Sequence, residues 1–405
     1  MKSSPVAGLT DFGPIDRFLS SKPADLAKDA WDRLLGPAES THCIRIVRRG
    51  FPADKWILSS AMQKQIRRGH AIQAVKTALV LHAVDPAYLP RRLPIVAFED
   101  IGIGNLAACF DVLFVFGRQR FPSNTSEADQ RRLLAGLVDG LARSIKSRAA
   151  CDIYCLAHLN PTSTGTVKAL ASSNARSLIA MIIDRDAPIT RRTLALHLLT
   201  GMSIREGRWP RTLSRFNPVA LRLVAERLEL PDAITWMLMQ GRHTSGLASF
   251  IPLVLGTVTA NQPLQMVEGD KGQSEYSDRL IRGIPAYSLD MYTRSGKAAI
   301  ADFTGAIREK HPLFLERLPN ERNHSKLVAN AIFHHEGAWL DRRLENDVLA
   351  GLSEQSDKAD LVDLGWPESA PRQPIYQLLN DENRLLWKIR RAHMESAFGA
   401  AEGDV

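Results

Sequence analysis

The chain has 405 residues, of which 45% are hydrophobic and 24% are charged, and its formal net charge at pH 7 is +8. This composition is typical of globular proteins and excludes an intrinsically disordered chain. No apolar run reaches the roughly 18 residues that a membrane-spanning helix needs, and residues 1–23 lack the apolar core of a signal peptide. We therefore expect a cytoplasmic protein of two or three domains, with no membrane among its partners.

The surplus of basic residues favours a polyanionic partner, nucleic acid above all, because contacts between Lys or Arg and phosphates release counterions and supply affinity. The four cysteines, Cys43, Cys109, Cys151 and Cys155, are too few for a disulfide framework. Cys151 and Cys155 share one helical face, but no second pair or nearby His completes a zinc set, so buried thiols are the favoured interpretation. We expect no metal and no cofactor.

In chain order, almost every patterned segment predicts a helix. Apolar residues recur at helical spacing in 24–35, 54–69, 70–84, 87–101, 105–117, 126–157, 166–183, 190–203, 286–308, 312–317, 324–351 and 376–397. Asp54 can cap one of these helices and Gly69 can end it. The run Ile251–Val258 is compatible with a strand, but it is too isolated to build a sheet. The sequence therefore predicts an all-α fold, a multi-helix array.

Two polar stretches, 160–165 and 261–278, are typical of linkers. They predict a division into consecutive segments. These are an N-terminal lead-in at 1–53, a helical domain at 54–160, a helical Arg-rich segment at 166–260 and a C-terminal helical domain with an acidic segment at 279–405.

The most basic stretch lies between Pro188 and Arg222, where seven arginines face a single acidic residue. Guanidinium groups bind phosphates in bidentate fashion, and aromatic rings stack on unpaired bases. This stretch supplies the first candidates for nucleic-acid contact, which are Arg205, Arg208, Trp209, Arg211 and Arg215. The alternative is internal pairing, because an acidic cluster between Glu345 and Glu368 could neutralise the arginines.

Motifs for known chemistry are missing. The G-x-x-x-x-G-K-[ST] pattern does not occur, and its nearest approach, Ser295–Ala298, lacks both the upstream glycine and the Ser/Thr, so the chain is no self-contained P-loop ATPase. The densest imidazole cluster is His334-His335-Glu336. Adjacent histidines on a helix point in different directions, so a shared metal ion is disfavoured there.

A third candidate lies at Asp290, Arg294 and Lys297. If a helix begins at Ala286, these residues fall on one face, and the two cations could hold a phosphate that the carboxylate orients. The alternative is a surface stripe of ion pairs, each worth only a few tenths of a kcal/mol.

The region from residue 54 to 157 also carries a family resemblance. Its residues are Ser60-Ala61, Lys64, Arg67-Arg68-Gly69, Ala74, Asp85-Pro86, Tyr88-Leu89, Arg91-Arg92-Leu93, Ala97, Glu99-Asp100-Ile101-Gly102 and Ser144–Ala150. This pattern resembles the C-terminal region of the replication-associated recombination protein family (RarA, also called MgsA), which are clamp-loader-like AAA+ ATPases. The resemblance implies a helical collar that joins subunits into a homo-oligomer beside a separate ATPase or replication protein. Pro94 departs from the pattern and should kink its helix or move the start of it.

Within this region, Arg67, Arg68, Arg91, Arg92, Lys146 and Arg148 could form a basic surface for DNA. The favoured alternative is a structural ion-pair network in which Arg92 and Glu99 take part. Our leading hypothesis is a non-catalytic, DNA-associated binding protein of replication, recombination or repair. The alternatives are an oligomeric protein–protein adaptor without DNA affinity and an enzyme that acts on a phosphate ester around Asp290.

Overall fold

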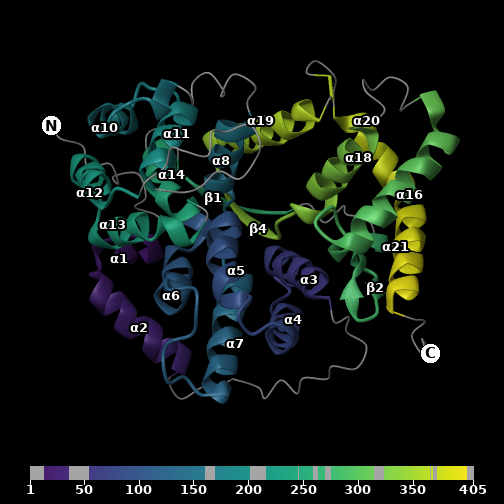
Figure 1. The fold of residues 1–405 in the computed structure, drawn as a ribbon, viewed down its shortest axis with the longest axis horizontal. Helices are drawn as coiled ribbons and strands as arrows, with labels where there is room; N and C mark the ends of the chain where they lie inside the picture. Colours follow the sequence, from purple (N-terminus) through teal and green to yellow (C-terminus); the bar gives the residue numbers. More distant parts are fainter. Residues whose placement is uncertain are drawn as a thin grey trace. The chain divides into compact units, whose positions relative to one another are not determined.

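The structure, a computed structural model, describes residues 13–35, 54–159, 169–200, 216–244, 246–258, 263–269, 275–313, 323–364, 366–367 and 372–398. These residues form helices almost throughout (Figure 1), so the prediction of an all-α, multi-helix array is confirmed. None of the described helices combines the length and apolarity needed to cross a membrane.

The chain divides into two compact units, and each unit is assembled from three separate stretches of sequence. The first unit contains Met1–Glu39, Pro90–Val267 and Arg342–Ala359; the second contains Ser40–Leu89, Glu268–Asp341 and Asp360–Val405. The units are therefore interleaved along the chain, whereas the sequence-based division used consecutive segments.

The first unit is a bundle of helices built around two strongly apolar helices, α6 and α14. Its elements are α1 (Gly13–Ser20), α2 (Pro23–Leu35), α5 (Leu89–Val96), α6 (Leu106–Phe116), α7 (Glu127–Arg143), α8 (Ala149–Leu159), α10 (Ala175–Ile183), α11 (Ile189–Thr200), α12 (Pro218–Arg227), α13 (Asp232–Met239), α14 (Leu247–Val258), β1 (Gln265–Glu268), β4 (Arg342–Glu345) and the start of α19 (Asp347–Asp363). Helix α6 packs on α2 and α7, and α14 packs on α8, α11 and α13. The run Ile251–Val258 is thus helical, because burial on nearly all sides lets a continuous apolar run form a core helix.

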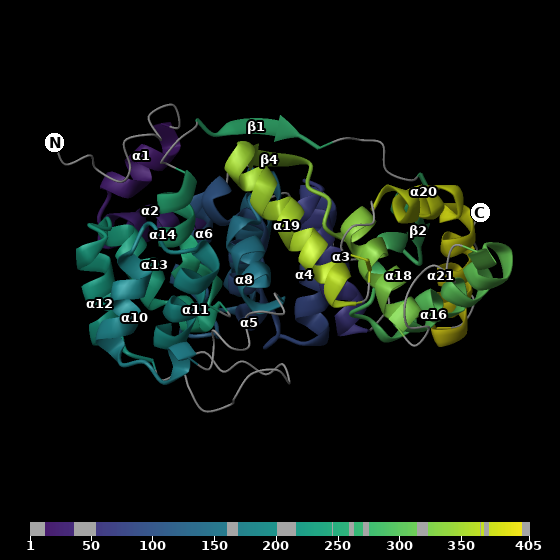
Figure 2. The ribbon, with the colours of Figure 1, turned by 90° about the horizontal axis from the view of Figure 1, so that it is seen from above.

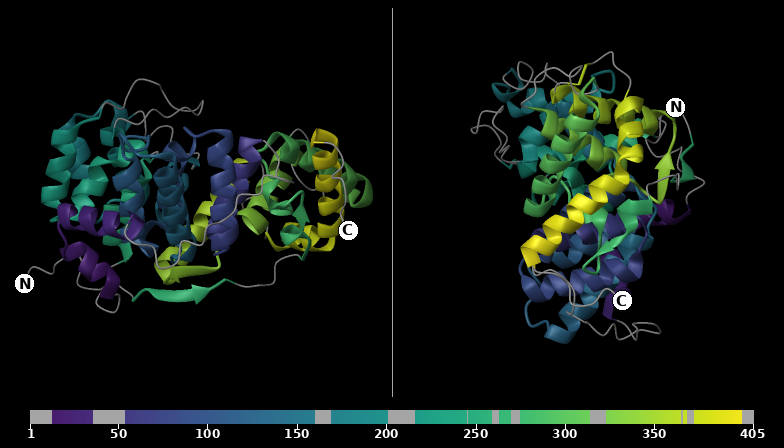
Figure 3. Two further views of the ribbon diagram at one scale, coloured as in Figure 1. Left: turned by 90° about the horizontal axis from the view of Figure 1, so that it is seen from below. Right: turned by 90° about the vertical axis from the view of Figure 1, so that its right-hand side faces the viewer.

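Two breaks interrupt the helices predicted in this unit. Pro94 lies inside α5, and a π-helical turn, Ala97–Ile101, follows directly. The predicted helix 126–157 is two helices, α7 and α8, because the backbone of Lys146 leaves the helix to bond β4. The Lys146 amide donates to the Arg342 carbonyl and the Leu344 amide donates to the Lys146 carbonyl, both at 2.9 Å. Strand β1 pairs with the same β4 (Figure 3).

Among the described residues, the second unit has fewer helices than the first. Its elements are α3 (Lys55–Arg67), α4 (Ala71–Val84), α15 (Glu275–Asp278), β2 (Leu280–Ile281), β3 (Ile284–Pro285), a 3-10 turn (Ala286–Ser288), α16 (Arg294–Lys310), α18 (His324–Ile332), a π-helical turn (Phe333–Gly337), α20 (Gln373–Asp381) and α21 (Asn383–Phe398). The predicted cap is confirmed, since the Asp54 carboxylate accepts from the amides of Trp56 and Ile57. Gly69 follows α3 with a φ of 70°, the left-handed conformation that ends a helix.

Hydrophobic contacts of the second unit fall into two clusters. In one, Phe303 of α16 packs with residues of α18, α20 and α21, and α16 and α21 lie side by side (Figure 2). In the other, Ile57 and Ala61 of α3 pack on Leu289 and on Met394 of α21. The second cluster brings α3 against the segment 286–290, which is where the buried polar side chains of this unit meet.

Candidate functional site

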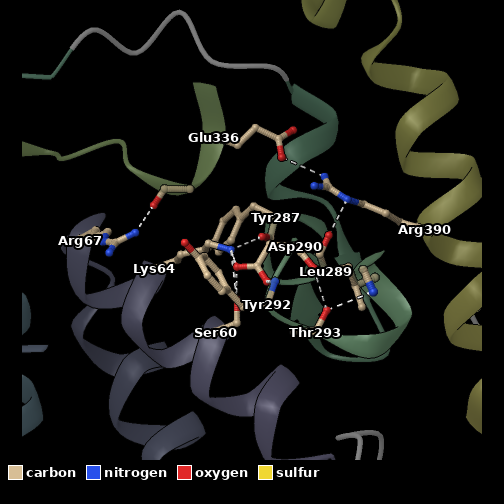
Figure 4. Close-up of polar contacts among 12 residues, drawn as sticks. Ser60, Lys64, Arg67, Tyr287, Leu289, Asp290, Tyr292, Thr293, Glu336 and Arg390 are labelled. Atoms are coloured by element: carbon tan, nitrogen blue, oxygen red, sulfur yellow. Dashed lines mark hydrogen bonds and ion pairs between the residues drawn. The ribbon is translucent and has the colours of Figure 1, made fainter. Parts of the chain in front are cut away.

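A buried ion pair occupies the centre of the second unit (Figure 4). The Lys64 ammonium of α3 donates to the Asp290 carboxylate, to the Tyr287 carbonyl at 2.7 Å and to the Ser60 hydroxyl at 3.0 Å. The Ser60 hydroxyl in turn donates to Asp290 at 2.9 Å. The side chains of Lys64 and Asp290 are only 2% and 5% exposed. Burial lowers the pKa of Lys64 to about 8, and the neighbouring Asp290 carboxylate partly offsets that effect.

Three arginines surround this pair. Arg67 donates to the Gly337 carbonyl at 2.5 Å, and Arg68 donates to the Glu336 carbonyl at 2.9 Å. Arg390 of α21 donates to the Glu336 carboxylate at 2.9 Å and to the Leu289 carbonyl at 3.0 Å. These donors tie α3, the turn at residues 333–337 and α21 together. We refer to Ser60, Lys64, Arg67, Arg68, Tyr287, Asp290, Glu336 and Arg390 as the Lys64 cluster.

Tyr287 lies next to these charges with its ring under the Arg68 guanidinium, whose carbon is 4.0 Å from the ring centroid. Its buried hydroxyl has no hydrogen-bond partner among the described residues. Burial raises the pKa of that hydroxyl, so the phenol stays neutral. The Lys64 cluster therefore consists of buried, paired charges and a neutral ring, and its contacts join three elements of the unit.

Four of the residues predicted to form a basic surface contact carbonyl or carboxylate groups of the protein itself. Arg67 and Arg68 are buried in the Lys64 cluster, and Lys146 is fully buried with its ammonium donating to the carbonyls of Ala142 and Ser144. Arg148 lies 4.0 Å from the buried Asp100 carboxylate. Burial withdraws Arg67, Arg68 and Lys146 from solvent, so these three side chains do not form an exposed surface in this structure.

The other two, Arg91 and Arg92, lie on α5. Arg91 is exposed, and Arg92 pairs with Glu99 at 3.7 Å. The ion pair between Arg92 and Glu99 agrees with the structural alternative for this region.

The three residues of the predicted phosphate site do not lie on one helix. The chain from Ala286 forms a short 3-10 turn, and α16 begins only at Arg294, so Asp290 is not on the helix that carries the two cations. Asp290 is buried and bound to Lys64, whereas Arg294 and Lys297 are exposed in the first turn of α16. The expected face of three cooperating side chains is therefore not formed, because the carboxylate is committed to Lys64.

The remaining candidates for nucleic-acid contact belong to the basic stretch between Pro188 and Arg222. Arg205, Arg208, Trp209, Arg211 and Arg215 lie outside the described residues. At the edges of that stretch, Arg191 and Arg222 are exposed and Arg192 is buried.

The two adjacent histidines of the imidazole cluster have different neighbours. His334 contacts Asp360 at 3.2 Å and His335 contacts Asn380 at 3.0 Å, so adjacent imidazoles have separate partners. Across the described ranges, no three or more His, Cys, Asp or Glu side chains are placed to share a metal ion.

The cysteines that the structure describes differ in exposure. Cys109 is fully buried, and that burial raises the pKa of its thiol. The sulfurs of Cys151 and Cys155 lie 4.0 Å apart on α8 and are half-buried. The Cys151–Cys155 pair, for which buried thiols were expected, is thus only partly buried, whereas Cys109 is fully enclosed.

One concave feature of the first unit was not anticipated from the sequence. It is a cleft of about 730 Å³, lined among others by Lys28 and Trp31 of α2, Phe114 of α6, Arg118, Arg120 and Phe121 of the following loop, and Trp236 of α13. We call it the Trp31 cleft. The rings of Trp31 and Phe114 meet edge to face with centroids 5.9 Å apart, and they are 37% and 36% exposed. Large aromatic side chains normally bury more of their surface than this.

The charges of the Trp31 cleft have one sign. Lys28, Arg118 and Arg120 are exposed, and none of them has an ion-pair or hydrogen-bond partner among the described residues. No Asp or Glu occurs among the described residues that line the cleft. The loop that carries both arginines is shaped by Gln119 and Asn124, whose φ angles of 56° and 66° are left-handed.

Sequence inspection missed this cleft because its aromatic and basic residues come from three distant segments. The only local signal is the Arg118–Phe121 run, in which two cations precede a ring.

Comparison with protein-family models, with curated proteins and with solved structures gave no match to this chain.

Proposed function

We propose that this protein is a non-catalytic nucleic-acid-binding protein that holds single-stranded DNA in the Trp31 cleft. The observation that supports the proposal most directly is the pairing of exposed rings with cations that lack a carboxylate partner. Bases stack on aromatic side chains, and phosphates attract Lys and Arg. A duplex keeps its bases stacked on one another, so a single strand is the form that can use these rings.

The setting of replication, recombination or repair rests on the resemblance of residues 54–157 to the RarA family alone. In that setting the protein would act as a homo-oligomer beside a separate ATPase. Neither the oligomer nor the partner ATPase contributes to the argument for the cleft.

Fluorescence anisotropy of labelled dT20 tests this proposal. Trp31→Ala should weaken binding by about 5- to 150-fold, because stacking on one aromatic ring is worth about 1–3 kcal/mol per base. Trp56→Ala is the matched control. Trp56 is 54% exposed and also lies beside a lysine, but that lysine, Lys55, pairs with Asp85 at 2.9 Å. We expect no loss of affinity in this variant.

Two outcomes would remove the proposal. One is an equal loss in both tryptophan variants, which would indicate non-specific contact. The other is binding of poly-aspartate as tight as binding of dT20, which would favour an acidic protein partner and hence the adaptor hypothesis.

A further inference from the structure

A second, smaller cavity in the first unit encloses a buried cation. It has a volume of about 310 Å³ and is lined by residues of α1, α11, α13 and α14 and of the loops that precede α11 and α13. Most of its wall is apolar. The apolar residues are Leu19, Ala187, Ile189, Leu228, Leu230, Pro231, Ile234, Pro252 and Leu255. We call it the Arg192 cavity.

Arg192 is only 8% exposed and forms no ion pair with a described carboxylate, although Asp184 lies near enough to act on its charge. Its Nε atom donates to the Ile182 carbonyl at the end of α10, at 2.9 Å. Its two amino groups make no hydrogen bond or ion pair with any described residue. Burial lowers the pKa of Arg192, the nearby Arg185 lowers it further, and the Asp184 carboxylate partly offsets both effects. A guanidinium in this position is short of a counter-charge, and an anion in the cavity would supply one.

Geometry and charge together restrict what that anion can be. The bond to Ile182 fixes the guanidinium, which leaves the fork of its amino groups for a bidentate acceptor. Arg185, Arg192 and Glu229 together give the cavity a net charge of +1, which a single negative charge matches. The apolar wall favours a hydrocarbon body behind the charged group.

We propose that the Arg192 cavity binds a small monocarboxylate with an apolar body, with the carboxylate on Arg192 and the hydrocarbon against Ile234, Pro252 and Leu255. This site is separate from the Trp31 cleft and does not depend on nucleic-acid binding. Exposed Arg185 and exposed Glu229 also line the cavity, so the attraction of Arg185 for an approaching anion is opposed by the Glu229 carboxylate and the buried Arg192 decides the sign.

Gly256 provides a test that does not threaten folding. It lies in α14 at the cavity wall, and a Cβ added there would meet no atom within 4 Å. Gly256→Leu should therefore fill the cavity while it improves the helix propensity of α14. The matched control is Gly140→Leu on α7, another helical glycine whose added Cβ would meet nothing and which does not line the cavity.

The probes are octanoate and its neutral counterpart 1-octanol, measured by titration calorimetry and thermal shift on the full chain. We expect octanoate to bind the wild type and Gly140→Leu alike and to bind Gly256→Leu at least tenfold more weakly, with no drop in the Tm of that variant. Arg192→Gln should weaken octanoate at least tenfold and leave octanol unchanged.

Three results would overturn the proposal. Equal binding of octanoate to Gly256→Leu and to the wild type would place the ligand elsewhere. Octanol binding as tight as octanoate would remove the role of Arg192. Binding of inorganic phosphate as tight as octanoate would remove the role of the apolar wall.

Discussion

Cations have opposite surroundings in the Lys64 cluster of the second unit and in the Trp31 cleft of the first. In the cluster, Lys64 is buried against Asp290, and the neighbouring arginines donate to carbonyls and to Glu336. In the cleft, Lys28, Arg118 and Arg120 are exposed beside aromatic rings and have no carboxylate partner among the described residues.

This difference indicates what each set of charges does. A buried charge is costly unless it is paired or hydrogen-bonded, so the stability of the second unit depends on the contacts of the cluster. Exposed cations without partners contribute little to folding and keep their full attraction for a ligand. The comparison predicts that substitutions in the cluster change stability, whereas substitutions in the cleft change binding.

The largest effect is expected for Asp290→Ala. Removing this carboxylate leaves the Lys64 ammonium buried without its counter-charge, which should reduce the free energy of unfolding by about 3–5 kcal/mol. Urea unfolding followed by circular dichroism measures the loss. As a control, Asp302→Ala removes an exposed carboxylate that lies 2.7 Å from His393, and it should cost less than about 1 kcal/mol.

Two further results bear on the same pair. A loss below about 1 kcal/mol in Asp290→Ala would mean that the Lys64 ammonium finds solvent or another partner. The double variant Lys64→Met with Asp290→Leu replaces both charges by apolar groups and should recover most of the stability.

The next effect is a pH dependence that belongs to Lys64. Its pKa is about 8 in the folded chain against an ordinary 10.5. Between these values the unfolded chain holds more protons at this residue, so the free energy of unfolding rises with pH through this window. A shift of this size corresponds to about 3 kcal/mol over the whole window.

Unfolding curves of the wild type and of Lys64→Met at pH 7.5 and pH 9.5 isolate this contribution. The difference between the two proteins should change by about 1–2 kcal/mol in favour of the wild type at the higher pH. The raised pKa values of Cys109 and Tyr287 act in the opposite direction at high pH, but they are present in both proteins and cancel. Parallel curves would contradict the lowered pKa of Lys64.

Local signals in the sequence were sufficient to predict many of the helices and some of their ends, although the run that forms α14 was expected to be compatible with a strand. Asp54 caps α3 and Gly69 ends it, because capping and left-handed φ angles depend on the residue itself. The break after Arg143 was not predictable in this way. No Gly or Pro marks it, and its cause is the pairing of the Lys146 backbone with Arg342, nearly 200 residues further along the chain.

The same limit explains the site predictions. Lys64 and Asp290 are 226 residues apart in sequence, and nothing in the local pattern of Lys64 distinguishes it from an exposed lysine. Arg67, Arg68 and Lys146 were candidates for a surface because charged residues are normally exposed. Their burial depends on carbonyl partners that only the folded chain supplies. The Trp31 cleft was missed for the complementary reason, since its cations and rings meet only in the tertiary structure.

A smaller effect is expected for the salt dependence of single-strand binding. Lys28→Gln, Arg118→Gln and Arg120→Gln each remove one cation from the cleft. If each contacts a phosphate, each substitution should lower the slope of log affinity against log salt by about 0.7. Anisotropy titrations of dT20 from about 50 to 200 mM salt measure the slope. An unchanged slope in the triple variant would show that these cations do not contact the strand.

The smallest effect is expected for the stability of that triple variant. None of the three cations has an ion-pair partner among the described residues, so their removal breaks no described contact, and each site should change the free energy of unfolding by no more than about 0.5 kcal/mol. Urea unfolding of the variant beside the wild type and Asp290→Ala measures both sides of the comparison at once. A loss of several kcal/mol would mean that the cleft cations are structural. In that case weaker binding of dT20 by the same variant would no longer locate the strand, because a partly unfolded cleft would lose affinity for any ligand.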